Sequence, residues 1–170
     1  MDSSCPFCRA KSATSPEEIV KYLRPWVKKK KAWALHSMGQ MYYFGDGVVQ
    51  SYEMARRLYE QAAERGNASS WASLGSMYSN REGVEQSYER AFECYLRAAN
   101  LGLVRSMFTV AALYANGQGV EQDLMKAKDF WTNAASQGHK MATKALKDLG
   151  WDEPSTSSSS YDPESSESFS

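Results

Sequence analysis

The sequence is poor in cysteine, lacks a long apolar run and has no net charge. Three cysteines in 170 residues are too few for a disulfide framework, so we expect a reducing compartment. Twenty Lys and Arg balance twenty Asp and Glu, which argues against a nucleic-acid partner because phosphate binding needs clustered positive charge. No apolar run approaches the roughly 18 residues of a membrane span, and the first residues lack the basic and apolar regions of a secretion signal. We therefore expect a cytoplasmic protein without a membrane span.

Charge is distributed unevenly along the chain. Residues 1–31 are net basic and end in the run Lys28–Lys31. Such a run is typical of a solvated stretch, and the alternative is a nuclear signal. Residues 152–170 are rich in serine and carry acidic but no basic residues. Because this tail has too few apolar side chains to offset the entropy of ordering, we predict that it is disordered.

The central part of the sequence repeats itself every 36 residues. Segments 31–66, 67–102 and 103–138 align without a gap, and the first two are identical at 16 of 36 positions. The residues shared by all three segments are Tyr42, Tyr78 and Tyr114, Gly47, Gly83 and Gly119, Val48, Val84 and Val120, Gln50, Gln86 and Gln122, Ala55, Ala91 and Ala127, Ala62-Ala63, Ala98-Ala99 and Ala134-Ala135, and Gly66, Gly102 and Gly138. Self-similarity at this period predicts a stack of repeated helical units, since no unit can bury its apolar face alone.

Each unit is predicted to form two helices. In the first unit, apolar residues at spacings of three and four indicate a helix over about 32–44, and the glycines that follow end it. A second helix is expected over about 51–65. Ser51 occupies the N-cap position of this helix, and Ser87 and Asp123 occupy the same position in the next two units.

Small residues inside the first helices need a physical reason. Gly39 and Gly75 each cost roughly 1 kcal/mol relative to alanine in a helix. We expect the compensation to be close approach of the partner helix through its alanine pair, such as Ala62-Ala63. We expect the aromatic residues Tyr59, Tyr95 and Trp131 to fill the space between units.

On each first helix, three positions that differ between the repeats lie outside the apolar face, and we call these positions the stripe. In helix-pair solenoids such a stripe commonly lines the concave surface. We therefore predict that it faces a protein or peptide partner, and the alternative is ordinary solvent exposure. The stripe consists of Ser37, Gln40 and Phe44, then Ser73, Ser76 and Asn80, then Thr109, Ala112 and Asn116.

The second unit carries the pattern Leu74-Gly75-x-x-Tyr78, then Gly83-Val84-x-Gln86-x-Tyr88-x-x-Ala91, then Tyr95-x-x-Ala98-Ala99-x-x-Gly102. This pattern resembles the Sel-1-like repeat family, and the longer period separates it from the tetratricopeptide repeat of about 34 residues. The resemblance covers residues 31–138 and reaches about residue 150. It implies an all-α, right-handed α/α solenoid of helix-turn-helix repeats. It further implies a non-catalytic adaptor or scaffold for protein complexes that needs no cofactor.

Cys5-Pro6-Phe7-Cys8-Arg9 brings two thiols to a spacing at which both can bind one zinc ion. A structural zinc site needs four ligands, so Cys5 and Cys8 alone form an incomplete metal site. The string resembles the end of a RING finger, a domain that recruits ubiquitin-conjugating enzymes. This resemblance implies an alternative function, the substrate-recruiting part of a RING-type ubiquitin ligase whose zinc domain is truncated here. The other interpretation is two exposed thiols in a frayed terminus, and we predict residues 1–14 to be disordered.

Two further segments are predicted to cap the stack. Ser15, Pro16 and Glu18 form a helix-start signal, so we expect residues 15–30 to contain a capping helix that runs to about Arg24, where Pro25 interrupts or restarts it. The open end of the first repeat is expected to be covered by Ile19, Leu23, Trp26 and Val27. Residues 139–151 form a partial fourth unit, which we expect to be a C-terminal cap helix. No catalytic constellation emerges, since neither His36 nor His139 has a Ser, Cys or carboxylate partner by spacing. We therefore predict that the protein is not an enzyme.

Overall fold

A computed structural model describes residues 15–151 of the chain. Within this range the chain forms eight α-helices and no strand. The helices are α2 (Pro16–Lys28), α3 (Ala32–Phe44), α4 (Tyr52–Ala63), α5 (Ala68–Asn80), α6 (Tyr88–Asn100), α7 (Val104–Asn116), α8 (Leu124–Ser136) and α9 (Lys140–Asp148). The predicted all-helical fold is confirmed.

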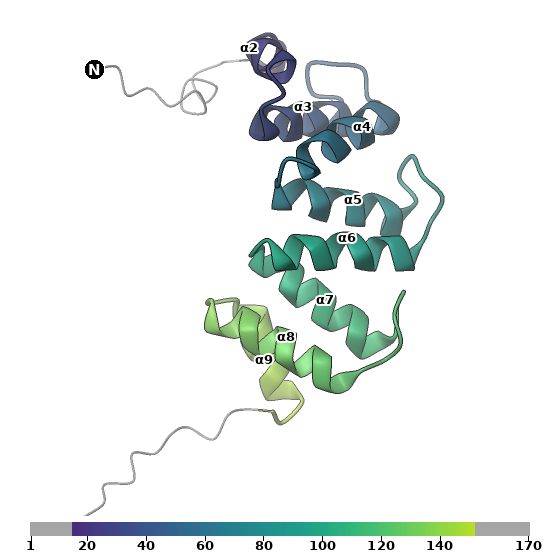
Figure 1. Cartoon of the computed structure of the whole chain (residues 1–170), viewed down its shortest axis with the longest axis vertical. Coiled ribbons are helices and arrows are strands. Elements are labelled where there is room, and N and C mark those ends of the chain that lie inside the picture. Colours follow the sequence, from purple (N-terminus) through teal and green to yellow (C-terminus); the bar gives the residue numbers. More distant parts are fainter. Residues whose placement is uncertain (1–14, 152–170) are drawn as a thin grey trace, which may run out of the picture.

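The helices stack one after another along the long axis of the molecule (Figure 1). Each helix packs on the next one in the sequence, and α2 and α9 lie at opposite ends of the stack. The three longer loops, which join α3 to α4, α5 to α6 and α7 to α8, lie on one side. The short turns between these pairs lie on the other side. The described chain is thus a solenoid of three helix pairs with one additional helix at each end.

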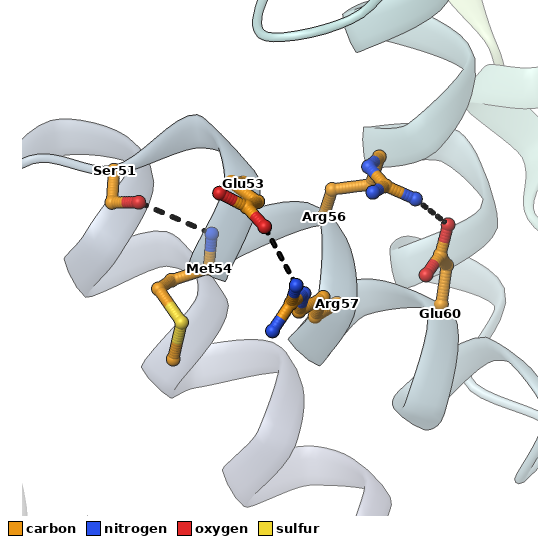
Figure 2. A network of polar contacts seen from close by, with 6 residues as sticks. All are labelled: Ser51, Glu53, Met54, Arg56, Arg57 and Glu60. Carbon is orange, nitrogen blue, oxygen red and sulfur yellow. Dashed lines mark hydrogen bonds and ion pairs between the residues drawn. The ribbon is translucent and has the colours of Figure 1, made fainter.

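Side chains cap the second helix of each pair as predicted. The hydroxyl of Ser51 accepts a hydrogen bond from the backbone N–H of Met54 at 3.2 Å, and Ser87 and Asp123 do the same for α6 and α8. Figure 2 shows this cap on α4 together with two ion pairs, each of which joins residues one helical turn apart. The pairs are Glu53–Arg57 at 2.7 Å and Arg56–Glu60 at 2.6 Å. Pairs of this kind stabilise a helix by about 0.3–0.5 kcal/mol each.

The glycines inside the first helices lie under aromatic rings. A Cβ added to Gly39 would lie 2.7 Å from Cε1 of Tyr59, and one added to Gly75 would lie 3.0 Å from ring carbons of Tyr95. The partner helix thus approaches each glycine closely, as expected, but the contact is made by its tyrosine ring and not by its alanine pair. The ring itself occupies the space of the missing side chain, and its burial offsets the conformational cost of glycine in a helix.

The glycine that all three long loops share, Gly47, Gly83 or Gly119, packs against the preceding unit. A Cβ at Gly83 would collide with the Cβ of Tyr52, in the first turn of α4, and one at Gly119 would collide with the backbone carbonyl of Tyr88, in the first turn of α6. The equivalent Gly47 approaches the backbone of Pro16, where a Cβ would lie 2.6 Å from the carbonyl carbon. Helix α2 therefore occupies the place of the second helix of a preceding repeat.

Helix α2 is longer than the sequence suggested. It starts at the predicted cap, Ser15, but it continues through Pro25 to Lys28 instead of ending near Arg24. A proline inside a helix costs about 3 kcal/mol because it removes a hydrogen bond and crowds the preceding turn. Packing of Trp26 and Val27 on the core of the first repeat offsets this cost, and the Trp26 ring lies 5.7 Å from the ring of Trp33.

We predict that alanine at Gly83 destabilises the protein more than alanine at Gly66. Both glycines have a positive φ, at +67° and +80°, so each substitution adds about 1 kcal/mol of backbone strain. Only the new side chain at Gly83 meets the preceding helix, which adds about 1–3 kcal/mol. Urea unfolding of Gly83→Ala and Gly66→Ala measures the difference, and equal losses of stability would contradict the packing argument.

Candidate partner-binding groove

A groove of about 810 Å³ crosses the solenoid on the face formed by the first helices. Its walls come from α3, α5, α7 and α9, with one tyrosine contributed by each of α4 and α6. The lining residues are His36, Gln40, Tyr43, Phe44, Tyr59, Ser69, Ala72, Ser73, Ser76, Tyr95, Leu103, Arg105, Ser106, Phe108, Thr109, His139 and Met141. A single groove therefore touches every repeat and the C-terminal cap.

Five of the nine predicted stripe residues line this groove. They are Gln40, Phe44, Ser73, Ser76 and Thr109. The other four are Ser37, Asn80, Ala112 and Asn116, which are not among its lining residues. The structure thus places part of the stripe along one groove. Binding of a partner by the stripe stays a prediction.

The groove runs diagonally across the repeats. On α3 it spans residues 36–44, on α5 residues 69–76, and on α7 only residues 105–109. The lining thus moves toward the N-terminal end of each successive first helix. Because the stripe was drawn at the same positions in every repeat, it missed His36, Tyr43 and Arg105 and included Asn80 and Asn116. Only the rotation of one repeat on the next, which a sequence alignment does not contain, distinguishes these positions.

The walls of the groove combine polar and apolar side chains and are largely uncharged. Burial raises the pKa of Tyr59 to about 12 and also raises the pKa values of Tyr43 and Tyr95, so these phenols stay neutral. Burial lowers the pKa of His36, which favours the neutral imidazole. Among the lining residues of the described chain, Arg105 is the one member of the Lys, Arg, Asp and Glu group.

Two equivalent buried serines, Ser70 and the groove residue Ser106, differ in their hydrogen bonding. The hydroxyl of Ser70 donates to Oδ1 of Asn67 at 2.9 Å and lies 3.0 Å from Nδ1 of His36. Ser106 takes the same place in the third repeat and is 1% exposed, but its hydroxyl has no hydrogen-bond partner among the described residues. Leu103 replaces Asn67 in that repeat, which removes the acceptor. A buried hydroxyl without a partner costs about 1–3 kcal/mol, and a ligand atom that bonds it recovers this energy.

We predict that the buried His36 makes the protein less stable in mild acid. Its pKa is lower in the folded state than in the unfolded chain, so the unfolded chain binds the proton more tightly. Stability is therefore highest above about pH 6.5 and falls as the pH drops through the unfolded pKa toward the folded one. The melting temperature of the wild type should fall between about pH 7.5 and pH 5.5, and His36→Gln should reduce this slope. An equal slope in the variant would show that other groups cause it.

The cysteines, which could react or bind a metal ion, lie apart from the groove or outside the described residues. Cys94 is buried, and this burial raises the pKa of its thiol to about 11, so it packs in the core as an unreactive group. Cys5 and Cys8, and with them the predicted tails 1–14 and 152–170, lie outside the described residues. Within residues 15–151, no three His, Cys, Asp or Glu side chains cluster as metal ligands would. No helix in this range has the length and apolar character needed to cross a bilayer.

The paired helices and the recurring loop glycines define an α-helical repeat protein. The family model "Sel1 repeat" matches residues 34–67, 72–103 and 104–139. The chain therefore belongs to the Sel1 repeat family, whose members are generally protein-interaction scaffolds.

Solved structures agree with this assignment. The chain is 32% identical to c5321, a protective antigen of uropathogenic Escherichia coli strains with an SLR fold, with a TM-score of 0.75 over 82% of this chain and 31% of the antigen. It is also 32% identical to a Sel1 repeat protein from Oxalobacter formigenes, with a TM-score of 0.71 over 76% of this chain and 97% of that protein. Cysteine rich protein B of Helicobacter pylori shares the fold at 17% identity, with a TM-score of 0.62 over 77% of this chain and 94% of the other. The chain thus spans about a third of the length of the antigen. The comparison with curated proteins found no match.

Proposed function

We propose that the protein is a non-catalytic adaptor that binds an extended segment of a partner protein in the groove. The observation that carries this proposal is the continuity of the groove over all three repeats and α9. A segment lying along it would contact each repeat in turn, which is how a solenoid uses its extended surface. Membership of the Sel1 repeat family supports the same role.

The chemistry of the walls suits a peptide with both apolar and polar side chains. Phe44 and Met141 lie at opposite ends of the groove and are 64% and 56% exposed, which makes them ready apolar contacts. Between them the half-buried rings of Tyr95 and Phe108 offer apolar surface, and aromatic side chains of this kind dominate interface energetics. Arg105 can pair with a carboxylate of the partner. None of these contacts requires a cofactor, and we propose that the chain uses none.

We predict that arginine at Ser73 and Ser76 weakens partner binding without unfolding the protein. Both serines line the middle of the groove on α5, so the long charged side chains would occupy the path of the bound segment. Peptides selected from a random display library against the full chain provide the ligand. The double variant should bind them at least about tenfold more weakly, which corresponds to about 1.4 kcal/mol.

A matched control distinguishes the groove from the rest of the surface. Asn133→Arg/Ser136→Arg places the same two charges three residues apart on exposed positions of α8, away from the groove. This variant should bind like the wild type, and circular dichroism should show the same helix content in all three proteins. Equal binding by both double variants would contradict the proposed groove.

The alternative function, the substrate-recruiting part of a RING-type ubiquitin ligase, depends on Cys5 and Cys8. The family model begins only at residue 34, and no comparison supports the RING resemblance. Our proposal is therefore limited to the adaptor role. Zinc binding at Cys5 and Cys8 stays a prediction that applies only if a complete RING domain accompanies the chain.

A further inference from the structure

A second hollow lies at the N-terminal end of the solenoid, between α2, α3 and α4. Its volume is about 570 Å³, within the range of ligand pockets. The apolar part of its lining includes Val20, Val27, Met38, Tyr42, Met54 and Leu58. We call this hollow the cap pocket.

The cap pocket and the groove use different faces of α3. Met38 and Tyr42 line the cap pocket, whereas His36 and Gln40 line the groove. Successive helical residues are turned by about 100°, so residues two apart lie on nearly opposite sides of the helix. The two sites share no lining residue. A partner in the cap pocket would therefore leave the groove free.

The rim of the cap pocket is basic. Lys21, Arg24 and Lys28 line it, and their spacing of three and four residues places them on one face of α2. All three are exposed, and no carboxylate among the described residues forms an ion pair with any of them. On the neighbouring α4, by contrast, Arg56 and Arg57 each pair with a glutamate one turn away. The cations at the cap pocket are thus available to an outside partner.

We propose that the cap pocket is a second docking site, which binds an acidic amphipathic helix of a partner protein. Charge complementarity selects this occupant, since carboxylates one turn apart on such a helix would face Lys21, Arg24 and Lys28. An apolar side chain of the same helix enters between Met38 and Met54. Methionine side chains suit this role because they are flexible and adapt to the shape of the anchor. The adaptor would then join two partners, one in each site.

Methionine methyl signals of the full chain provide the test. Met38 and Met54 line the cap pocket, Met141 lines the groove, and Met77 and Met125 line neither. The probe is a synthetic helical peptide with leucine on one face and glutamate on the other. Its addition should shift the ¹³C-methyl signals of Met38 and Met54 and leave those of Met77, Met125 and Met141 in place. A peptide with lysine in place of glutamate should not bind.

Charge reversal at the rim tests the electrostatic part of the proposal. Lys21→Glu/Arg24→Glu/Lys28→Glu should weaken binding of the glutamate peptide at least tenfold. The matched control, Lys140→Glu/Lys144→Glu/Lys147→Glu, makes the same change in charge on exposed residues of α9 and should bind like the wild type. If the rim variant does not fold, Met54→Ala replaces it, because Met54 is 38% exposed and its loss should weaken binding while the fold is retained.

Three results would overturn the proposal. The first is the absence of a shift at Met38 and Met54 with the peptide in excess, as expected if another segment of the chain already fills the cap pocket. The second is a shift at Met141 alone, which would place the peptide in the groove. The third is equal binding of the glutamate and lysine peptides, which would show that the basic rim selects nothing. None of these results contradicts the proposed role of the groove, which the Ser73 and Ser76 variants test separately.

Discussion

The glycine shared by the three long loops packs against the first turn of a helix in the preceding unit, and the spacing of the whole solenoid depends on this contact. Gly83 meets Tyr52, and Gly119 meets Tyr88, so closely that any side chain on the glycine would collide. Gly47 makes the same contact with Pro16 of α2. Helix α2 is therefore part of the stack, because it supplies the surface that the first repeat needs from a predecessor.

This spacing brings the first helices side by side and thereby forms the groove. Within each of the first two pairs, a tyrosine ring lies on a helix glycine, so the two helices approach closely while the phenol faces the groove. Between pairs, His36 of α3 lies within hydrogen-bonding distance of Ser70 of α5. The face that binds partners in our proposal is thus built from the same contacts that hold the repeats together. Docking of α2 likewise closes one side of the cap pocket.

The sequence predicted the helices well because the repeat itself carries the information. Three aligned copies define where each helix begins and where glycine ends it, and the predicted first helix, 32–44, agrees with α3. The predictions failed where a tertiary contact decides the outcome. Helix α2 continues past Pro25 to Lys28, held by the expected packing of Trp26 and Val27 on the first repeat. The ring of Tyr59, and not an alanine, lies against Gly39. The groove was predicted in part, since its diagonal course arises from a rotation between repeats that is absent from the alignment.

Native-state hydrogen exchange of the full chain tests most directly whether α2 is part of the stack. Amide protons exchange at rates set by local opening, so a helix held by the solenoid exchanges together with its neighbours. Our account predicts that the amides of residues 20–28 are protected to a similar degree as those of α3 and α4. Fast exchange in α2 beside strong protection in α3 would contradict it, because the first repeat would then be stable without the contact between Gly47 and Pro16.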